Sequence, residues 1–127
     1  MAFASIAFAL AMVMPPDVPY PYVQIIQEGD QYVMRTLDGS KPLYTYDKDQ
    51  PGKSTCVAAC AAAWPPLQAK AGAKPMGKWT IITRPDRSRQ WAFGGKPVYT
   101  YSHDADSRAS GDGMGGVWHL LPTTRAR

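Results

Sequence analysis

The stretch GSKPLYTYDKD, residues 39–49, returns later in the chain as GGKPVYTYSHD, residues 94–104. Seven of the eleven positions hold the same residue at a constant offset of 55, in a chain of only 127 residues. Self-similarity at a fixed period is the signature of a repeat architecture, so the chain consists of two copies of one supersecondary unit. The fold therefore depends on how two similar units pack together.

Each copy has the pattern of a three-stranded β-meander that ends in the repeated stretch. Alternating side chains bounded by Gly, Asp and Pro turns are typical of strands. One meander buries too little apolar surface alone, so we expect the two to pack about a pseudo-twofold axis. The fold class is mainly β, with one short Cys-bearing helix and an apolar N-terminal arm. The expected strands are residues 23–27, 31–37 and 42–46 in the first copy, and 79–83, 90–93 and 97–101 in the second.

A proline-rich segment, residues 15–21, separates an apolar start from the repeats, because proline ends helices. We expect residues 1–21 to be a hydrophobic arm and linker, and residues 22–127 to form one domain with repeats at about 22–70 and 78–122. Residues 1–14 carry no charge and are too few to cross a bilayer, which takes ~20 apolar residues as a helix. We expect them to contact a membrane interface or, preferably, a membrane-associated partner.

Basic side chains gather in the second half of the chain. Residues 1–64 hold 6 acidic and 4 basic side chains, whereas residues 65–127 hold 4 acidic and 10 basic ones. This bias favours a solvated basic face, and it also suits an acidic protein or anionic lipid headgroups. No pattern of a nucleic-acid-binding module occurs, so we expect no nucleic-acid partner. The basic residues include Lys70, Lys74, Lys78, Arg84, Arg87, Arg89, Arg125 and Arg127.

The repeated Tyr-x-Tyr-x-x-Asp pattern allows two interpretations. The rings could form two aromatic binding platforms. Alternatively, one ring of each copy packs in the core, and each aspartate accepts backbone amide hydrogens to fix the turn after the strand. We favour the second interpretation, because two equivalent turns explain the duplication without a ligand. The motif residues are Tyr44, Tyr46 and Asp49, and Tyr99, Tyr101 and Asp104.

The two cysteines of the chain, Cys56 and Cys60, lie in an expected helix over residues 54–64. Ser54 or Thr55 is the expected N-cap, and two prolines after Trp64 end the helix. An isolated cysteine pair suggests a disulfide formed in an oxidising compartment. Positions four apart in a regular helix lie ~6 Å apart along the axis, which is far for a disulfide, so Cys56 is expected at a loosened first turn.

A copper-binding or thiol-redox site is the alternative for this cysteine pair. Thiolates favour Cu(I), and His103 or His119 could supply a third ligand. The apolar neighbours of the cysteines would not lower a thiol pKa, which argues against this alternative.

Other chemistry has little support in the sequence. Residues 47–58 begin like an EF-hand loop but place Ala58 where calcium needs a glutamate. Residues 111–116 are glycine-rich but no Gly-Lys-Ser/Thr follows, so they form no phosphate loop. Glu28 is the only glutamate, and no catalytic triad is indicated. We expect no enzyme activity and no cofactor.

Taken with the segment PGKSTCVAACAAAWPPL that follows the first copy and GDGMGGVWHLL that follows the second, the repeat resembles a bacterial family. This is the family of secreted-repeat lipoproteins with a Tyr-x-(Phe/Trp/Tyr)-x-x-Asp motif, and the resemblance covers residues 31–121. It implies an extracytoplasmic location and a disulfide, but no defined reaction. The basic signal and lipobox cysteine typical of that family are missing, so we expect no lipid anchor on this chain.

These observations favour a non-catalytic accessory or structural subunit at the periplasmic or extracellular face. We expect it to dock on protein subunits of a membrane-associated assembly through residues 1–14 and the basic second half. The rival hypothesis is the periplasmic copper or thiol-redox protein. A third is a binder of small aromatic or carbohydrate ligands through exposed tyrosines.

Overall fold

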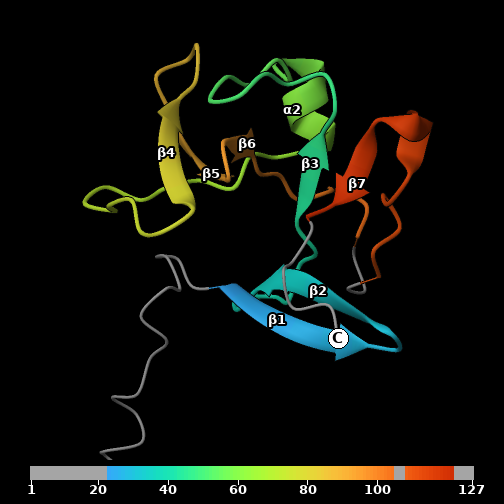
Figure 1. Cartoon of the computed structure of the whole chain (residues 1–127). Coiled ribbons are helices and arrows are strands. Elements are labelled where there is room, and N and C mark those ends of the chain that lie inside the picture. Colours follow the sequence, from blue (N-terminus) through green and yellow to red (C-terminus); the bar gives the residue numbers. More distant parts are fainter. Residues whose placement is uncertain (1–22, 105–107, 122–127) are drawn as a thin grey trace, which may run out of the picture.

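The computed structural model describes residues 23–104 and 108–121, and the predicted arm and linker lie outside them. The described residues form the mainly β fold that the sequence predicts, with one small helix (Figure 1). The elements are β1 (Val23–Glu28), β2 (Gln31–Thr36), β3 (Tyr44–Tyr46), α2 (Ala59–Ala63), β4 (Trp79–Thr83), β5 (Arg89–Phe93), β6 (Lys96–Pro97), the 3-10 helix η1 (Met114–Gly116) and β7 (Trp118–Leu120).

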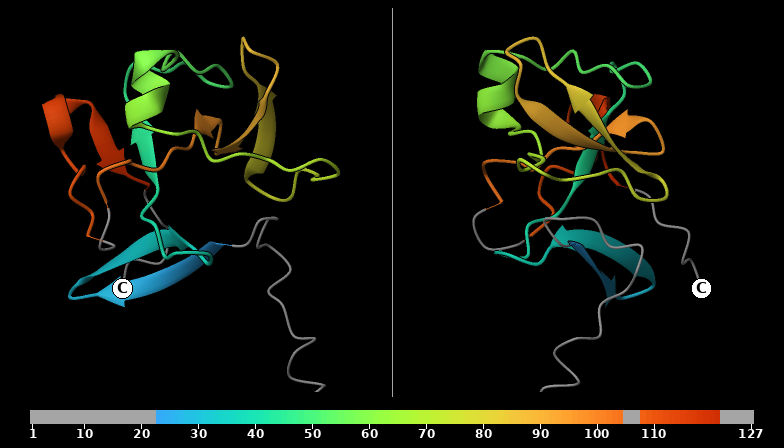
Figure 2. Two further views of the ribbon diagram at one scale, coloured as in Figure 1. Left: turned by 180° about the vertical axis from the view of Figure 1, so that it is seen from behind. Right: turned by 90° about the vertical axis from the view of Figure 1, so that its left-hand side faces the viewer.

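Each copy begins with an antiparallel hairpin, as expected. In the first copy β1 pairs with β2 from Val23↔Thr36 to Glu28↔Gln31, and the chain reverses at Gly29, whose φ of 64° suits glycine. In the second copy β4 pairs with β5, and β6 adds a third strand. The corresponding segment of the first copy joins β2 through a bridge between Arg35 and Pro42. Figure 2 shows the β1–β2 hairpin below the rest of the body in both views.

The repeated strands meet at equivalent residues. The Tyr44 amide donates to the Tyr99 carbonyl at 2.8 Å, and the Tyr99 amide donates to the Tyr44 carbonyl at 2.9 Å. Because these tyrosines occupy the same place in their copies, the pseudo-twofold axis passes between them.

The copies also exchange their last extended segments, which the sequence did not reveal. β7 of the second copy pairs with β3 of the first, with Tyr44 opposite Leu120. Correspondingly, the Leu67 amide of the first copy donates to the Val98 carbonyl of the second at 2.9 Å. The two meanders are therefore intertwined and do not simply pack side by side.

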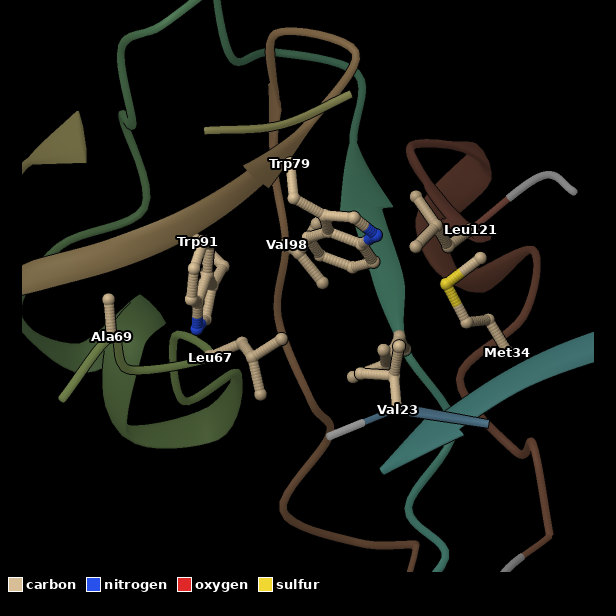
Figure 3. Packing of buried hydrophobic residues seen from close by; sticks show 9 residues of the cluster. Val23, Met34, Leu67, Ala69, Trp79, Trp91, Val98 and Leu121 are labelled. Atoms are coloured by element: carbon tan, nitrogen blue, oxygen red, sulfur yellow. The ribbon is translucent and has the colours of Figure 1, made fainter. Parts of the chain in front are cut away.

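The repeated strands have buried side chains on both faces. Leu43 and Val98 belong to a cluster that includes Trp79, Trp91 and Leu121, most of which Figure 3 shows at close range. Tyr44 and Tyr99 point into a second cluster with Trp64, Trp118 and Cys56. The period of two in a strand explains the division, because neighbouring side chains enter different clusters.

The helix is shorter than expected, and its predicted cap is wrong. It begins after Ala58, whose φ is 57°, and no side chain caps it. Ser54 and Thr55 do not cap because their hydroxyls bond elsewhere, to Tyr99 and Asp49 respectively. The end of the helix agrees with the prediction, since Trp64 follows the last helical residue and precedes the prolines. Among the described residues, no helix has the length and apolar character needed to cross a membrane.

Candidate functional site

The first tyrosine of each motif donates a hydrogen bond to the aspartate of the other copy's motif. The Tyr44 hydroxyl donates to Asp104 Oδ2 at 2.6 Å, and the Tyr99 hydroxyl donates to Asp49 Oδ2 at 2.6 Å. Both phenol rings are fully buried, so these hydroxyls depend on protein acceptors. The repeated motif thus makes two equivalent hydrogen bonds across the pseudo-twofold axis.

The second oxygen of each aspartate orders the turn that follows the motif. Asp49 Oδ1 accepts the Thr55 amide at 2.7 Å and the Thr55 hydroxyl at 3.0 Å. Asp104 Oδ1 accepts the Ser110 amide at 3.0 Å and also its hydroxyl. Thr55 and Ser110 are themselves 55 residues apart. A hydroxyl side chain six residues after each aspartate was therefore a further sign of the repeat, and sequence reasoning missed it.

Burial, and after it the hydrogen bond to Asp104, raises the pKa of Tyr44 well above its usual range. Burial and the hydrogen bond to Asp49 do the same to the pKa of Tyr99. Ionising either phenol would place a second negative charge beside a carboxylate in a site with little water.

An alkaline titration is expected to show two late tyrosines. Above pH ~10 the unfolded chain ionises Tyr44 and Tyr99 while the folded protein keeps them neutral. The stabilisation from these two groups is therefore complete below that pH and is lost as the pH rises toward their raised pKa values. We expect two of the seven tyrosines to ionise together with unfolding, followed by phenolate absorbance and circular dichroism on one sample. Ionisation of all seven before any loss of structure would contradict this.

Four aromatic rings form a stacked column next to the two tyrosine–aspartate pairs. Trp64 and Trp118 lie parallel in its centre, with ring centroids 3.8 Å apart and an interplanar angle of 3°. Tyr101 stacks on Trp64 at 4.1 Å, and Tyr46 stacks on Trp118 at 4.2 Å. Each tyrosine therefore packs on the tryptophan of the other copy. One face of the Tyr46 ring and one face of the Tyr101 ring are therefore covered by a tryptophan, and Tyr44 and Tyr99 are fully buried.

Gly111 lies against this column and leaves no room for a side chain. A Cβ atom there would lie 2.6 Å from Trp64 Cη2 and 3.1 Å from Tyr101 Cδ2. We expect Gly111→Ala to lower the free energy of unfolding by about 1–3 kcal/mol through overpacking. Denaturant unfolding measures this loss. Gly111 does not have a positive φ, so its loss comes from overpacking, whereas Gly52→Ala, with a φ of 72° and nothing within 4 Å of its Cβ, shows the effect of backbone strain for comparison. An unchanged stability in Gly111→Ala would contradict the close packing.

A buried arginine, Arg84, connects the hydrogen-bonded pair of Tyr99 and Asp49 to the segment that carries Cys56. Arg84, which the sequence placed with the basic face, is only 5% exposed. Its Nη1 donates to Ser54 Oγ at 2.9 Å and to Gln90 Oε1 at 2.8 Å, and its Nη2 donates to the Cys56 carbonyl at 2.7 Å. Ser54 Oγ lies 2.6 Å from the Tyr99 hydroxyl oxygen. Because that hydroxyl donates to Asp49, Ser54 is the donor to Tyr99, and a continuous chain of hydrogen bonds links Arg84 to Asp49.

Cys56 and Cys60 form the predicted disulfide, with Cα atoms 5.2 Å apart. Cys56 was expected in a loosened first helical turn. It instead lies in a non-helical segment before the helix, and only Cys60 lies within the helix. The two histidines have other neighbours. His119 Nε2 lies 2.7 Å from Asp47 Oδ2, and the His103 ring lies 5.2 Å from the Tyr101 ring. Within residues 23–104 and 108–121, no three His, Cys, Asp or Glu side chains are grouped to hold a metal ion, and the copper ligands of the rival hypothesis are not assembled there.

Comparison with known proteins gave a match to one protein family. The model of a family described as a secreted repeat of unknown function matches residues 33–68 and 80–121. The two matched segments correspond to the two copies described above. Neither the curated proteins nor the solved structures gave a match.

Proposed function

The chain belongs to the family of secreted repeats of unknown function, and on that premise we propose that it is a non-catalytic extracytoplasmic subunit that docks on a membrane-associated protein assembly. The location has two supports, the secreted family and the disulfide between Cys56 and Cys60. Disulfides persist in oxidising compartments such as the periplasm and the cell exterior.

The observation that carries the non-catalytic role is the internal use of the motif's polar atoms. Asp104 is 6% exposed, and its two carboxylate oxygens accept from Tyr44 and Ser110. A general base or nucleophile must reach a substrate atom within hydrogen-bond distance. The repeated Tyr-x-Tyr-x-x-Asp residues, which we propose as the defining motif of this repeat, are therefore better suited to fixing the scaffold.

If the motif fixes the scaffold, contact with other proteins has to come from segments that the two copies do not share. Residues 1–14, which lie outside the described residues, are the proposed anchor because they are uncharged and almost wholly apolar. The basic second half is the proposed second contact, where complementary charge would guide docking.

The test is co-purification of the native protein from membranes, with and without residues 1–14. We expect the full chain to fractionate with membranes and to co-purify with defined partner subunits, and the truncated chain to lose both. A control variant of full length carries Lys48→Gln and Lys53→Gln, two exposed positions in the first half, and is expected to keep both properties. Unchanged membrane fractionation and unchanged co-purification after the truncation would overturn the proposal.

A thiol and copper titration separates this proposal from its rival. We expect no thiol to react in the native oxidised protein, because each cysteine sulfur is bonded to the other. We also expect no stoichiometric Cu(I) binding without a reductant that breaks this bond, since thiolates are the ligands that Cu(I) prefers. Reactive thiols in the native protein together with tight Cu(I) binding would favour the rival.

A further inference from the structure

We propose that the loop of residues 70–78 is a contact surface for anionic lipid headgroups. The segment reads Lys-Ala-Gly-Ala-Lys-Pro-Met-Gly-Lys, and its three lysines have no acidic neighbour in sequence, because residues 50–85 contain no Asp or Glu. This inference rests on the proposed membrane-associated location and names the chemistry of one of its contacts. Hereafter this segment is called the lysine loop.

The lysine loop projects from the body between residue 69, which is in the core, and the buried start of β4. Figures 1 and 2 show it, in yellow-green, extending from the side of the molecule before β4. All its residues except Ala73 are exposed, and Ala73 packs against the first core cluster. Met76 is 40% exposed although its side chain is apolar. The loop therefore presents lysines and one methionine together on a projecting part of the surface.

Backbone hydrogen bonds hold the loop in shape. The Ala73 amide donates to the Lys70 carbonyl at 3.0 Å, and the Arg89 guanidinium donates to the Lys70 and Ala73 carbonyls at 3.3 and 3.1 Å. At the other end, Met76 and Trp79 exchange two backbone bonds of 2.8 and 2.9 Å. Hydrogen-bonded turns at residues 70–73 and 76–79 thus shape the loop, so binding there would order little additional backbone.

The chemistry of the loop suits lipid headgroups better than an acidic protein. Lysine is a point charge that needs no directional partner, whereas recognition of protein carboxylates favours the planar fork of arginine. The one arginine at this loop, Arg89, donates to the loop's own carbonyls. Protein interfaces are also depleted in lysine and depend on central aromatic or arginine anchors. A flexible methionine between lysines can enter the apolar boundary while the ammonium groups stay among the headgroups.

The experiment measures binding of the full chain to vesicles of phosphatidylcholine with and without phosphatidylglycerol. The loop variant carries Lys74→Gln and Lys78→Gln, and the control carries Lys48→Gln and Lys53→Gln. At about 1 kcal/mol for each lysine at an anionic surface, the loop variant is expected to bind anionic vesicles at least tenfold more weakly. The control is expected to bind like the natural chain, and Met76→Ser is expected to weaken binding at unchanged net charge. Added salt is expected to weaken binding of the natural chain and to affect the loop variant less.

Equal binding of the loop variant and the natural chain to anionic vesicles would overturn the inference. If that variant instead lost only its co-purifying subunits, the loop would be a protein contact, which also overturns it. Residues 1–14 are uncharged, so any binding that they cause persists on neutral vesicles and in the loop variant. Failure of the arm truncation test would thus refute the proposed docking function, whereas failure here would refute the lysine loop alone. Unchanged thermal unfolding of the loop variant shows that the substitutions leave the fold intact.

Discussion

Replacing Trp64 with alanine is expected to lower the free energy of unfolding by about 3–5 kcal/mol, the usual cost of removing a large buried aromatic side chain. Trp64 is only 5% exposed and lies in the middle of the ring column. It stacks on Trp118 and Tyr101, and its ring is nearly perpendicular to the Tyr44 ring, with the two ring centroids 5.3 Å apart. Its loss would leave a cavity at the place where the two copies join, and both copies would lose contacts.

Urea unfolding of Trp64→Ala beside Trp64→Phe measures this effect. The phenylalanine variant keeps a ring in the column, so its loss is expected to be clearly smaller. Both variants remove one of two parallel indoles 3.8 Å apart, so both are expected to change the near-ultraviolet circular dichroism, to which the separate Trp79–Trp91 pair still contributes. A loss below about 1 kcal/mol in Trp64→Ala would mean that the column does not stabilise the domain, since most buried truncations cost more.

The repeat in the sequence was enough to predict the pseudo-twofold fold. Equivalent residues in two linked copies prefer equivalent surroundings, and Tyr44 and Tyr99 meet at the axis for this reason. The hairpins were also predictable, because their turns contain glycine or Asp next to short alternating strands. Local pattern and global fold agree in these segments, which is typical of natural sequences.

The exchange of strands could not be predicted from pattern alone. A β7 strand can pair with β3 or with its own copy's segment at the same local cost, since both partners carry the same Tyr-Thr-Tyr sequence. Tertiary contacts far apart in sequence decide between them, such as the bond from Tyr44 to Asp104.

Two polar residues were misplaced for a related reason. A serine or threonine before an apolar run usually caps a helix, but Thr55 bonds to Asp49 and leaves the helix to begin later. Arg84 is charged and was assigned to the surface, yet three acceptors satisfy it in the interior, and two of them, Ser54 Oγ and the Cys56 carbonyl, come from a segment about 30 residues away. Nothing in the local sequence identifies such partners, because buried charges are tolerated only where the fold supplies them.

Asp104→Ala is the second substitution with a large expected effect, a loss of about 3 kcal/mol or more of stability. The buried carboxylate accepts from the Tyr44 hydroxyl and from Ser110, and hydrogen bonds to charged groups contribute about 1.5–3 kcal/mol each. Without the carboxylate, the Tyr44 hydroxyl remains fully buried with no acceptor in this place. Asp49→Ala is the matched comparison. Asp49 is half-buried, and the Tyr99 hydroxyl that it leaves still has Ser54 Oγ at 2.6 Å as a hydrogen-bond partner, so we expect a smaller loss.

A double-mutant cycle tests whether the copies truly exchange these bonds. Tyr44→Phe combined with Asp104→Ala removes two groups that touch across the copies, and a coupling energy of about 1–3 kcal/mol is expected. Tyr44→Phe combined with Asp49→Ala removes two groups of the same copy that share no hydrogen bond, and their effects should add within about 0.5 kcal/mol. The three single and two double variants are compared with the natural chain by urea unfolding under identical conditions.

The contrast between the two cycles distinguishes two topologies built from the same sequence. If each copy were a self-contained meander, Tyr44 would be held by Asp49 of its own copy and the stronger coupling would lie within the copy. In the exchanged arrangement each copy satisfies the buried hydroxyl of the other, so neither can bury its tyrosine at low cost without its partner. Stronger coupling of Tyr44 to Asp49 than to Asp104 would therefore overturn the exchange. The expected result is a larger coupling energy between Tyr44 and Asp104 than between Tyr44 and Asp49. It would mean that the repeated motif joins the two copies into one cooperative unit.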